Sequence, residues 1–139
     1  MILGGLLFWF LATLAAFAIP AALGLSVIYA VYSALVRHRD GWRRNPFDWP
    51  DLLTPPLVAA TWLSVAMFEE ALGIGYGKTL ANAVVEPMLA GAGWCAAWIV
   101  RLVFFSRSTN SRRKVAWIML AAICAATVAL ALFMPDLPE

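Results

Sequence analysis

The chain has 139 residues, of which 63% are hydrophobic and only 13% are charged, with a formal net charge of +2. Soluble globular domains carry about 25% charged residues, so this composition excludes an ordinary soluble domain and predicts that lipid is the main solvent. Each membrane-spanning helix uses about 20 residues. Four spans joined by short connections therefore account for almost the whole length, and no soluble catalytic domain is expected.

The first predicted span, residues 3–36, is an uncharged run that is longer than a bilayer requires. As a straight helix it would reach about 50 Å, because a helix rises about 1.5 Å per residue, whereas the hydrocarbon core is about 30 Å thick. Pro20 lacks a backbone donor and Gly24 follows one turn later, so these two residues are predicted to form a kink or hinge. We expect one kinked span, with a hairpin of two short helices as the alternative.

The second predicted span covers residues 52–70. It follows a segment, residues 37–51, that is rich in arginine, tryptophan and proline and is therefore expected to form a loop at the membrane interface. Pro55 and Pro56 stand near the expected start of the helix, where a missing backbone donor costs little. Glu69 and Glu70 close the span.

The third and fourth predicted spans cover residues 87–105 and 115–134. Proline is favoured as the first residue of a helix, so the third span is expected to begin at Pro87, with Glu86 beside the positive end of the helix dipole. Residues 78–85 would then form a short outer helix or loop. The predicted fold is an all-α bundle of four transmembrane helices, in a single domain that covers residues 1–139.

A glycine-rich segment, residues 73–77, separates the second span from Lys78. Its last four residues, Ile-Gly-Tyr-Gly, resemble the core of the potassium-channel selectivity filter, in which carbonyl oxygens of four such loops replace the hydration shell of the ion. Gly73 stands where that family has threonine, and Lys78 where it has an acidic residue. A filter would also need residues 57–72 to re-enter the membrane from outside, which would move the arginine-rich first connection across the bilayer. A turn between two helices is therefore predicted.

Charge placement predicts the orientation of the chain in a membrane. Lys and Arg are retained on the cytoplasmic side, and nine of the ten here belong to the first and third connections if Arg101 is counted with the third. Both connections are therefore expected in the cytoplasm, with the N- and C-termini outside, in a bacterial inner membrane. The side chains expected to contact anionic lipid headgroups are Arg37, Arg39, Arg43, Arg44, Arg107, Arg112, Arg113 and Lys114.

Small residues at a spacing of four predict where two helices pack, because they let the backbones approach closely in lipid. Such faces are predicted to join the third and fourth helices. The residues concerned are Gly93 and Ala97 in the third span and Ala121 and Ala125 in the fourth. Trp94 and Trp98 lie beside this stripe, and their position favours contact with lipid or with a partner over a cofactor shelf.

Three carboxylates are candidates for binding an ion or ligand, because ionisable groups near membrane depth are costly and often mark ion or proton pathways. They are Glu69, Glu70 and Glu86. If Glu86 lies below the surface, Lys78 is its nearest available partner, and the pair would form an ion or ligand contact on the outer side. The alternative is that all three are hydrated side chains at helix ends, with Glu86 stabilised by the helix dipole.

The residues that metal, redox and nucleophilic chemistry require are scarce. The chain has one histidine, His38, which cannot supply two axial haem ligands, and no set of residues has metal-ligand spacing, so no cofactor is expected. No serine or cysteine has suitable partners on one side of the membrane, so the chain is not expected to be an enzyme. Nucleic-acid binding is not expected either, because anionic lipid satisfies the arginines and no stacking platform is present.

The remaining function classes are those of a non-catalytic membrane protein. The small-residue faces and the overlong first helix favour a subunit, scaffold or assembly partner that interacts with other membrane protein subunits or with copies of itself. The alternatives are a small ion channel or carrier that uses the outer carboxylates, and a membrane immunity or phage-exclusion factor.

Overall fold

The computed structural model describes residues 2–36, 47–72, 78–104, 109–135, 137 and 138. These residues form four long helices and contain no strand. The helices are α1 (Ile2–Val36), α2 (Trp49–Leu72), α3 (Leu80–Phe104) and α4 (Thr109–Phe133). All four are long and apolar enough to cross a membrane, which agrees with the predicted fold class.

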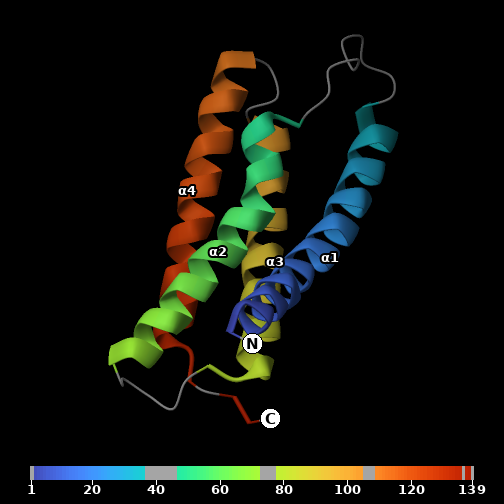
Figure 1. Ribbon diagram of the computed structural model, residues 1–139. Helices are drawn as coiled ribbons and strands as arrows, with labels where there is room; N and C mark the ends of the chain where they lie inside the picture. Colours follow the sequence, from blue (N-terminus) through green and yellow to red (C-terminus); the bar gives the residue numbers. More distant parts are fainter. Residues whose placement is uncertain (1, 37–46, 73–77, 105–108, 136, 139) are drawn as a thin grey trace.

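The helices run alternately up and down (Figure 1). The helix ends that flank the two basic connections therefore lie together, and we call this the basic end of the bundle. The N-terminus of α3 and both chain termini lie toward the opposite end, which we call the terminal end. The helix ends that flank the two basic connections are thus grouped at one end, in agreement with the predicted topology.

The helices form a square in which α1 and α4 occupy one diagonal and α2 and α3 the other. The most extensive contact joins α1 to α3, followed by that between α2 and α4, so parallel helices form the two largest contacts. A buried apolar cluster lies inside the square and includes Phe17 of α1, Val58 of α2 and Ile123 of α4. Trp94 and Trp98 of α3 belong to the same cluster, so the prediction that they face lipid or a partner is wrong.

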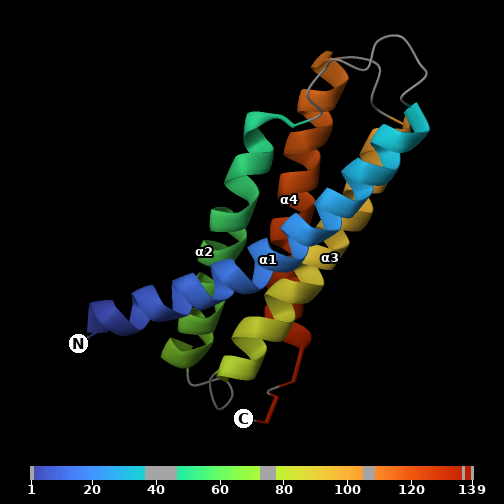
Figure 2. The ribbon, with the colours of Figure 1, turned by 90° about the vertical axis from the view of Figure 1, so that its right-hand side faces the viewer.

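α1 is one continuous helix that passes through Pro20, so the hairpin alternative is not what the chain forms. The helix changes direction near its middle (Figure 2). Its first residues extend beyond the other helices, and a methyl group placed on Gly4 or Gly5 would have no neighbour within 4 Å. The excess length of α1 is therefore accommodated by a change of direction and a projecting N-terminal segment.

α1 and α3 approach each other closely at glycines outside the predicted packing face. A methyl group placed on Gly91 would lie 3.1 Å from the backbone oxygen of Phe17, and one on Gly24 would lie 2.6 Å from Cys95 Sγ. A methyl group on Gly93, in the predicted face, would lie 3.8 Å from the nearest atom of Ile123, which is ordinary contact. Gly24 thus serves close packing between α1 and α3 besides its predicted place in a hinge.

The face that α4 buries also differs from the predicted one. Ala121 and Ala125 are exposed, and Ala97 of α3 is half-buried. Alanine is common all around an apolar helix, so a spacing of four does not by itself identify the packed side; larger side chains fill this contact. The buried stripe of α4 consists of Ala116, Met119, Leu120, Ile123, Thr127 and Ala131.

We expect Gly91→Ala to destabilise the protein by about 1 to 3 kcal/mol, because the new methyl group would press on α1 backbone that cannot rotate away. Gly93→Ala is the matched control on the same helix, where there is room and the better helix propensity of alanine should stabilise by about 0.5 to 1 kcal/mol. Unfolding of the purified protein in mixed micelles with increasing denaturing detergent measures both. Equal effects of the two substitutions would contradict the tight contact at Gly91.

α2 begins at Trp49, before the predicted start at residue 52. The Asp48 N–H donates to Asp51 Oδ2 at 2.8 Å, and the Asp51 N–H donates to the Asp48 carbonyl at 2.9 Å. The first of these bonds is the half of a capping box in which the side chain of the third helical residue satisfies the amide of the capping residue, and the second is a backbone hydrogen bond of the first turn. The interface segment therefore already contains the first turn of α2, and Pro55 and Pro56 lie inside the helix.

α3 begins at Leu80, two turns before the predicted start at Pro87. The Thr79 hydroxyl accepts a hydrogen bond from the Asn82 N–H at 3.3 Å, so Thr79 caps the helix. Pro87 lies within α3 and costs it one backbone hydrogen bond, which transmembrane helices tolerate. The prediction was wrong because it gave the preference of proline for the first position more weight than a threonine cap.

Residues 73–77, which carry the resemblance to a selectivity filter, lie outside the described residues. The helix before them is described, and α2 runs from the basic end to the terminal end of the bundle (Figure 1). Residues 57–72 therefore do not form the re-entrant helix that such a filter requires.

Candidate functional site

Among the described residues, Lys78 with Glu86 and Arg101 with Asp51 form buried ion pairs, one toward each end of the bundle. Lys78 Nζ lies 3.1 Å from Glu86 Oε1 near the start of α3, and the two side chains are 4% and 0% exposed. Arg101 Nη1 lies 2.7 Å from Asp51 Oδ1, and these side chains are 2% and 3% exposed. Buried charges are stable only when they are paired and hydrogen-bonded, so the surroundings of each pair decide what it can do.

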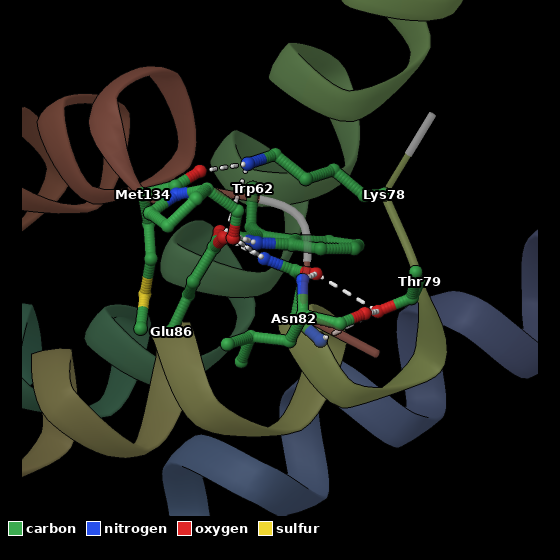
Figure 3. Close-up of polar contacts among 8 residues, drawn as sticks. Trp62, Lys78, Thr79, Asn82, Glu86 and Met134 are labelled. Carbon is green, nitrogen blue, oxygen red and sulfur yellow. Dashed lines mark hydrogen bonds and ion pairs between the residues drawn. The ribbon is translucent and has the colours of Figure 1, made fainter. Parts of the chain in front are cut away.

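Glu86 is at the centre of the first cluster (Figure 3). Its Oε2 accepts a hydrogen bond from the indole nitrogen of Trp62 at 2.6 Å, across the diagonal between α2 and α3. Its Oε1 accepts from Asn82 Nδ2 at 2.7 Å and from Lys78 Nζ at 3.1 Å. Both carboxylate oxygens are thus engaged by protein donors, one of them cationic.

The end of α4 completes this cluster. Lys78 Nζ also donates to the carbonyl of Met134 at 3.0 Å, and Asn82 Nδ2 donates to the carbonyl of Pro135 at 3.1 Å. Leu137 N–H donates to Asn82 Oδ1 at 2.9 Å. The Thr79 hydroxyl lies 2.8 Å from Asn82 Oδ1 and 3.0 Å from the Leu137 carbonyl, and its single proton serves one of them at a time. We call Trp62, Lys78, Thr79, Asn82 and Glu86 the terminal cluster.

The second ion pair links α2 to α3 at the basic end. Asp51 accepts from Arg101 with one oxygen and from the Asp48 amide with the other, so it both caps α2 and neutralises a charge on α3. The guanidinium carbon of Arg101 lies 4.4 Å from the ring centroid of Trp98, within the range of a cation–π contact. Arg101, which was counted with the third connection, is therefore a buried residue of the helix.

The predicted carboxylate group is only partly assembled. Glu86 and Lys78 form the pair that was expected if Glu86 is buried, whereas Glu69 is half-buried and Glu70 is exposed near the end of α2. The hydrogen bonds of Glu86 come from Trp62, Lys78 and Asn82, and they involve neither Glu69 nor Glu70.

The predicted lipid-contacting residues that the structure describes lie on the first turns of α4. Arg113 and Lys114 are exposed and Arg112 is half-buried. The guanidinium carbon of Arg113 lies 5.9 Å from the ring of Trp49, which packs edge-on against Trp117 at 4.7 Å between ring centroids. This grouping of cations with half-exposed tryptophans is typical of a membrane interface. Arg37, Arg39, Arg43, Arg44 and Arg107 lie outside the described residues.

Four further residues in these clusters were not predicted: Asp51, Trp62, Thr79 and Asn82. The contact of Asp51 with Arg101 could have been predicted, because a lone arginine in an apolar span requires an acid at the same depth. The predicted topology places Asp51 at the same end of the bundle as Arg101. Trp62 and Asn82 gave no comparable signal, since their contacts depend on the rotation of α2 and on the start of α3.

The described residues contain no group of three or more His, Cys, Asp and Glu residues that could hold a metal ion. Comparison of the chain with protein-family models, curated proteins and solved structures gave no match. Each of the two clusters is a closed set of complementary donors and acceptors, which is suited to fixing helices against one another.

Proposed function

We propose that the chain is an integral membrane protein with four spans, which acts without catalysis as a subunit or assembly partner of a membrane complex or of a homo-oligomer. The basic end faces the cytoplasm and its arginines contact anionic lipid, because Lys and Arg are retained on that side. The terminal end, with both termini, faces outside. The membrane is the inner membrane of a bacterium.

The observation that carries a structural role is the closure of the terminal cluster. An ion pathway needs an ionisable group that can exchange its partner for a transported ion. Glu86 is 0% exposed, and its two oxygens accept from Trp62, Asn82 and Lys78. Such a carboxylate fixes α3 to α2 and to the end of α4, and this supports a helix-locking function over transport.

The projecting start of α1 supports interaction with another chain. Leu7, Phe8 and Leu11 are each more than half exposed, and Gly4 and Gly5 have space around them. A helix face that its own bundle leaves exposed gains van der Waals contact in a membrane by packing on a neighbouring helix, and small residues permit close approach there. The α1 segment of residues 4–11 is the part of the chain that we propose contacts a partner subunit or a second copy.

Purification in mild detergent, followed by native mass spectrometry, tests this role. We expect a defined complex of two or more chains that is lost in Gly4→Leu, because the larger side chain blocks the contact without touching the fold of the single chain. Val31→Leu, on the exposed side of the same helix, is the matched control and should leave the complex intact.

The competing function gives a different result. A monomer that carries protons or monovalent cations into liposomes, with the flux abolished by Glu86→Gln, would replace the proposed role by transport. A complex that survives Gly4→Leu would show that the α1 segment is not the contact.

The orientation is tested by single cysteines in a chain with both native cysteines replaced by alanine. A membrane-impermeant maleimide applied to intact cells should label Pro138→Cys and leave Asn110→Cys unlabelled until the membrane is opened. Labelling of position 110 in intact cells would contradict the proposed orientation.

A further inference from the structure

The segment that follows α4 is held mainly through its backbone. Four hydrogen bonds join it to the start of α3, and they involve the carbonyls of Met134, Pro135 and Leu137 and the amide of Leu137. No side chain of the segment takes part in these four bonds. The donors and acceptors of Lys78, Thr79 and Asn82 therefore recognise backbone groups and place little restriction on the sequence that occupies the site.

Asn82 is the residue that gives this recognition its register. Its amide nitrogen donates to the carbonyl of Pro135, while its amide oxygen accepts from the N–H of Leu137 two residues later. Asn82 is 0% exposed and is itself held by Glu86 at 2.7 Å. The amide is thus orientated before the segment binds, with a donor and an acceptor turned toward the backbone of its occupant.

The sequence of the segment suits this site. Pro135 and Pro138 bias the residues before them, Met134 and Leu137, toward an extended backbone. Neither proline has an N–H to donate. The hydrogen bond that the segment donates to Asn82 comes from the Leu137 N–H, so the prolines leave it intact. The segment therefore loses little conformational freedom when it binds.

We infer that Lys78, Thr79 and Asn82 form a binding site for a peptide backbone, which backbone groups of Met134, Pro135 and Leu137 of the same chain occupy and which the identical segment of a second copy can enter. A tethered segment has an effective concentration in the millimolar range, so the chain's own segment holds the site until it is released. Exchange of this segment would then join two copies. The inference goes beyond the proposed function and stands on these contacts whether or not α1 binds a partner.

The test uses the full chain in lipid nanodiscs and the fluorescently labelled peptide Met-Pro-Asp-Leu-Pro-Glu, which carries the sequence of residues 134–139. Leu137→Pro removes the N–H that donates to Asn82 Oδ1 and should release the chain's own segment. Leu137→Ala keeps this N–H and is the matched control. We expect the peptide to bind the Leu137→Pro chain at least tenfold more tightly than the wild-type or Leu137→Ala chain, by fluorescence anisotropy.

Two modified peptides separate backbone recognition from partition into lipid. Methylation of the leucine nitrogen should weaken binding to the Leu137→Pro chain at least tenfold, because it removes one hydrogen-bond donor and keeps every side chain. Replacement of that leucine by alanine should change the affinity less than threefold. The inference is overturned if the unmodified peptide does not bind the Leu137→Pro chain, if the methylated peptide binds as well, or if the alanine peptide does not bind.

Discussion

Glu86→Gln is expected to destabilise the protein by about 3 to 5 kcal/mol, the cost of breaking a buried ion pair by removing one partner. The carboxylate accepts hydrogen bonds at both oxygens, whereas an amide offers one oxygen and one NH2 group. The NH2 group of the glutamine would therefore face either the Trp62 donor or the donors of Lys78 and Asn82. Lys78 would also keep a buried charge without its counter-ion. The free energy of unfolding in mixed micelles measures the loss.

Two variants make this result specific to the terminal cluster. Glu70→Gln removes a carboxylate that is exposed near the same end of the bundle, and its effect should stay within about 0.5 kcal/mol. The double variant Lys78→Met, Glu86→Gln should be more stable than Glu86→Gln alone, because the uncompensated charge is removed as well. A double variant that is no better than the single one would show that the ion pair is not the source of the loss.

Arg101→Met is expected to have an effect of similar size at the basic end, about 3 to 5 kcal/mol. The change leaves the Asp51 carboxyl buried at the first turn of α2 without its counter-ion and removes the cation–π contact with Trp98. Arg113→Met is the matched control, since Arg113 is exposed and lies 5.9 Å from the ring of Trp49; its effect should stay below about 1 kcal/mol. The same unfolding measurement compares the two.

A second variant checks the origin of that loss. Asp51→Asn in the Arg101→Met chain removes the unpaired charge and keeps an oxygen that can accept from the Asp48 amide. It should recover part of the stability that Arg101→Met loses. A further loss of the same size would mean that the two residues contribute independently, contrary to the 2.7 Å contact between them.

The helices themselves could be predicted because long apolar runs have few other structures available. The end of each run was harder, since it depends on local capping. Pro87 satisfies the usual rule for a first helical residue, and only the hydroxyl of Thr79, which accepts from the Asn82 amide, moves the start of α3 to Leu80. Likewise, the spacing of the alanines in α4 did not reveal which side of the helix faces the bundle, and Ala121 and Ala125 proved to be exposed.

The terminal cluster was half predictable for a related reason. Lys78 and Glu86 are separated by only eight positions, so the local sequence was enough to predict Lys78 as the partner of a buried Glu86. Trp62 and the backbone of Pro135 lie 24 and 49 positions from Glu86, which makes their contributions a product of the tertiary arrangement. Charge pattern alone identified the pair, and packing decided how it is enclosed.

The polar links between α2 and α3 bear on the biogenesis of the protein. The candidate membrane spans of these helices have the lowest mean hydropathy of the four spans. The two helices sit on a diagonal with little direct contact, yet Asp51 with Arg101 and Trp62 with Glu86 connect them near both ends. Asp51 is synthesised well before Arg101 and cannot be neutralised by it until α3 has emerged from the ribosome. We therefore expect α2 to remain beside the translocon until α3 arrives, and the two to enter the bilayer as a unit.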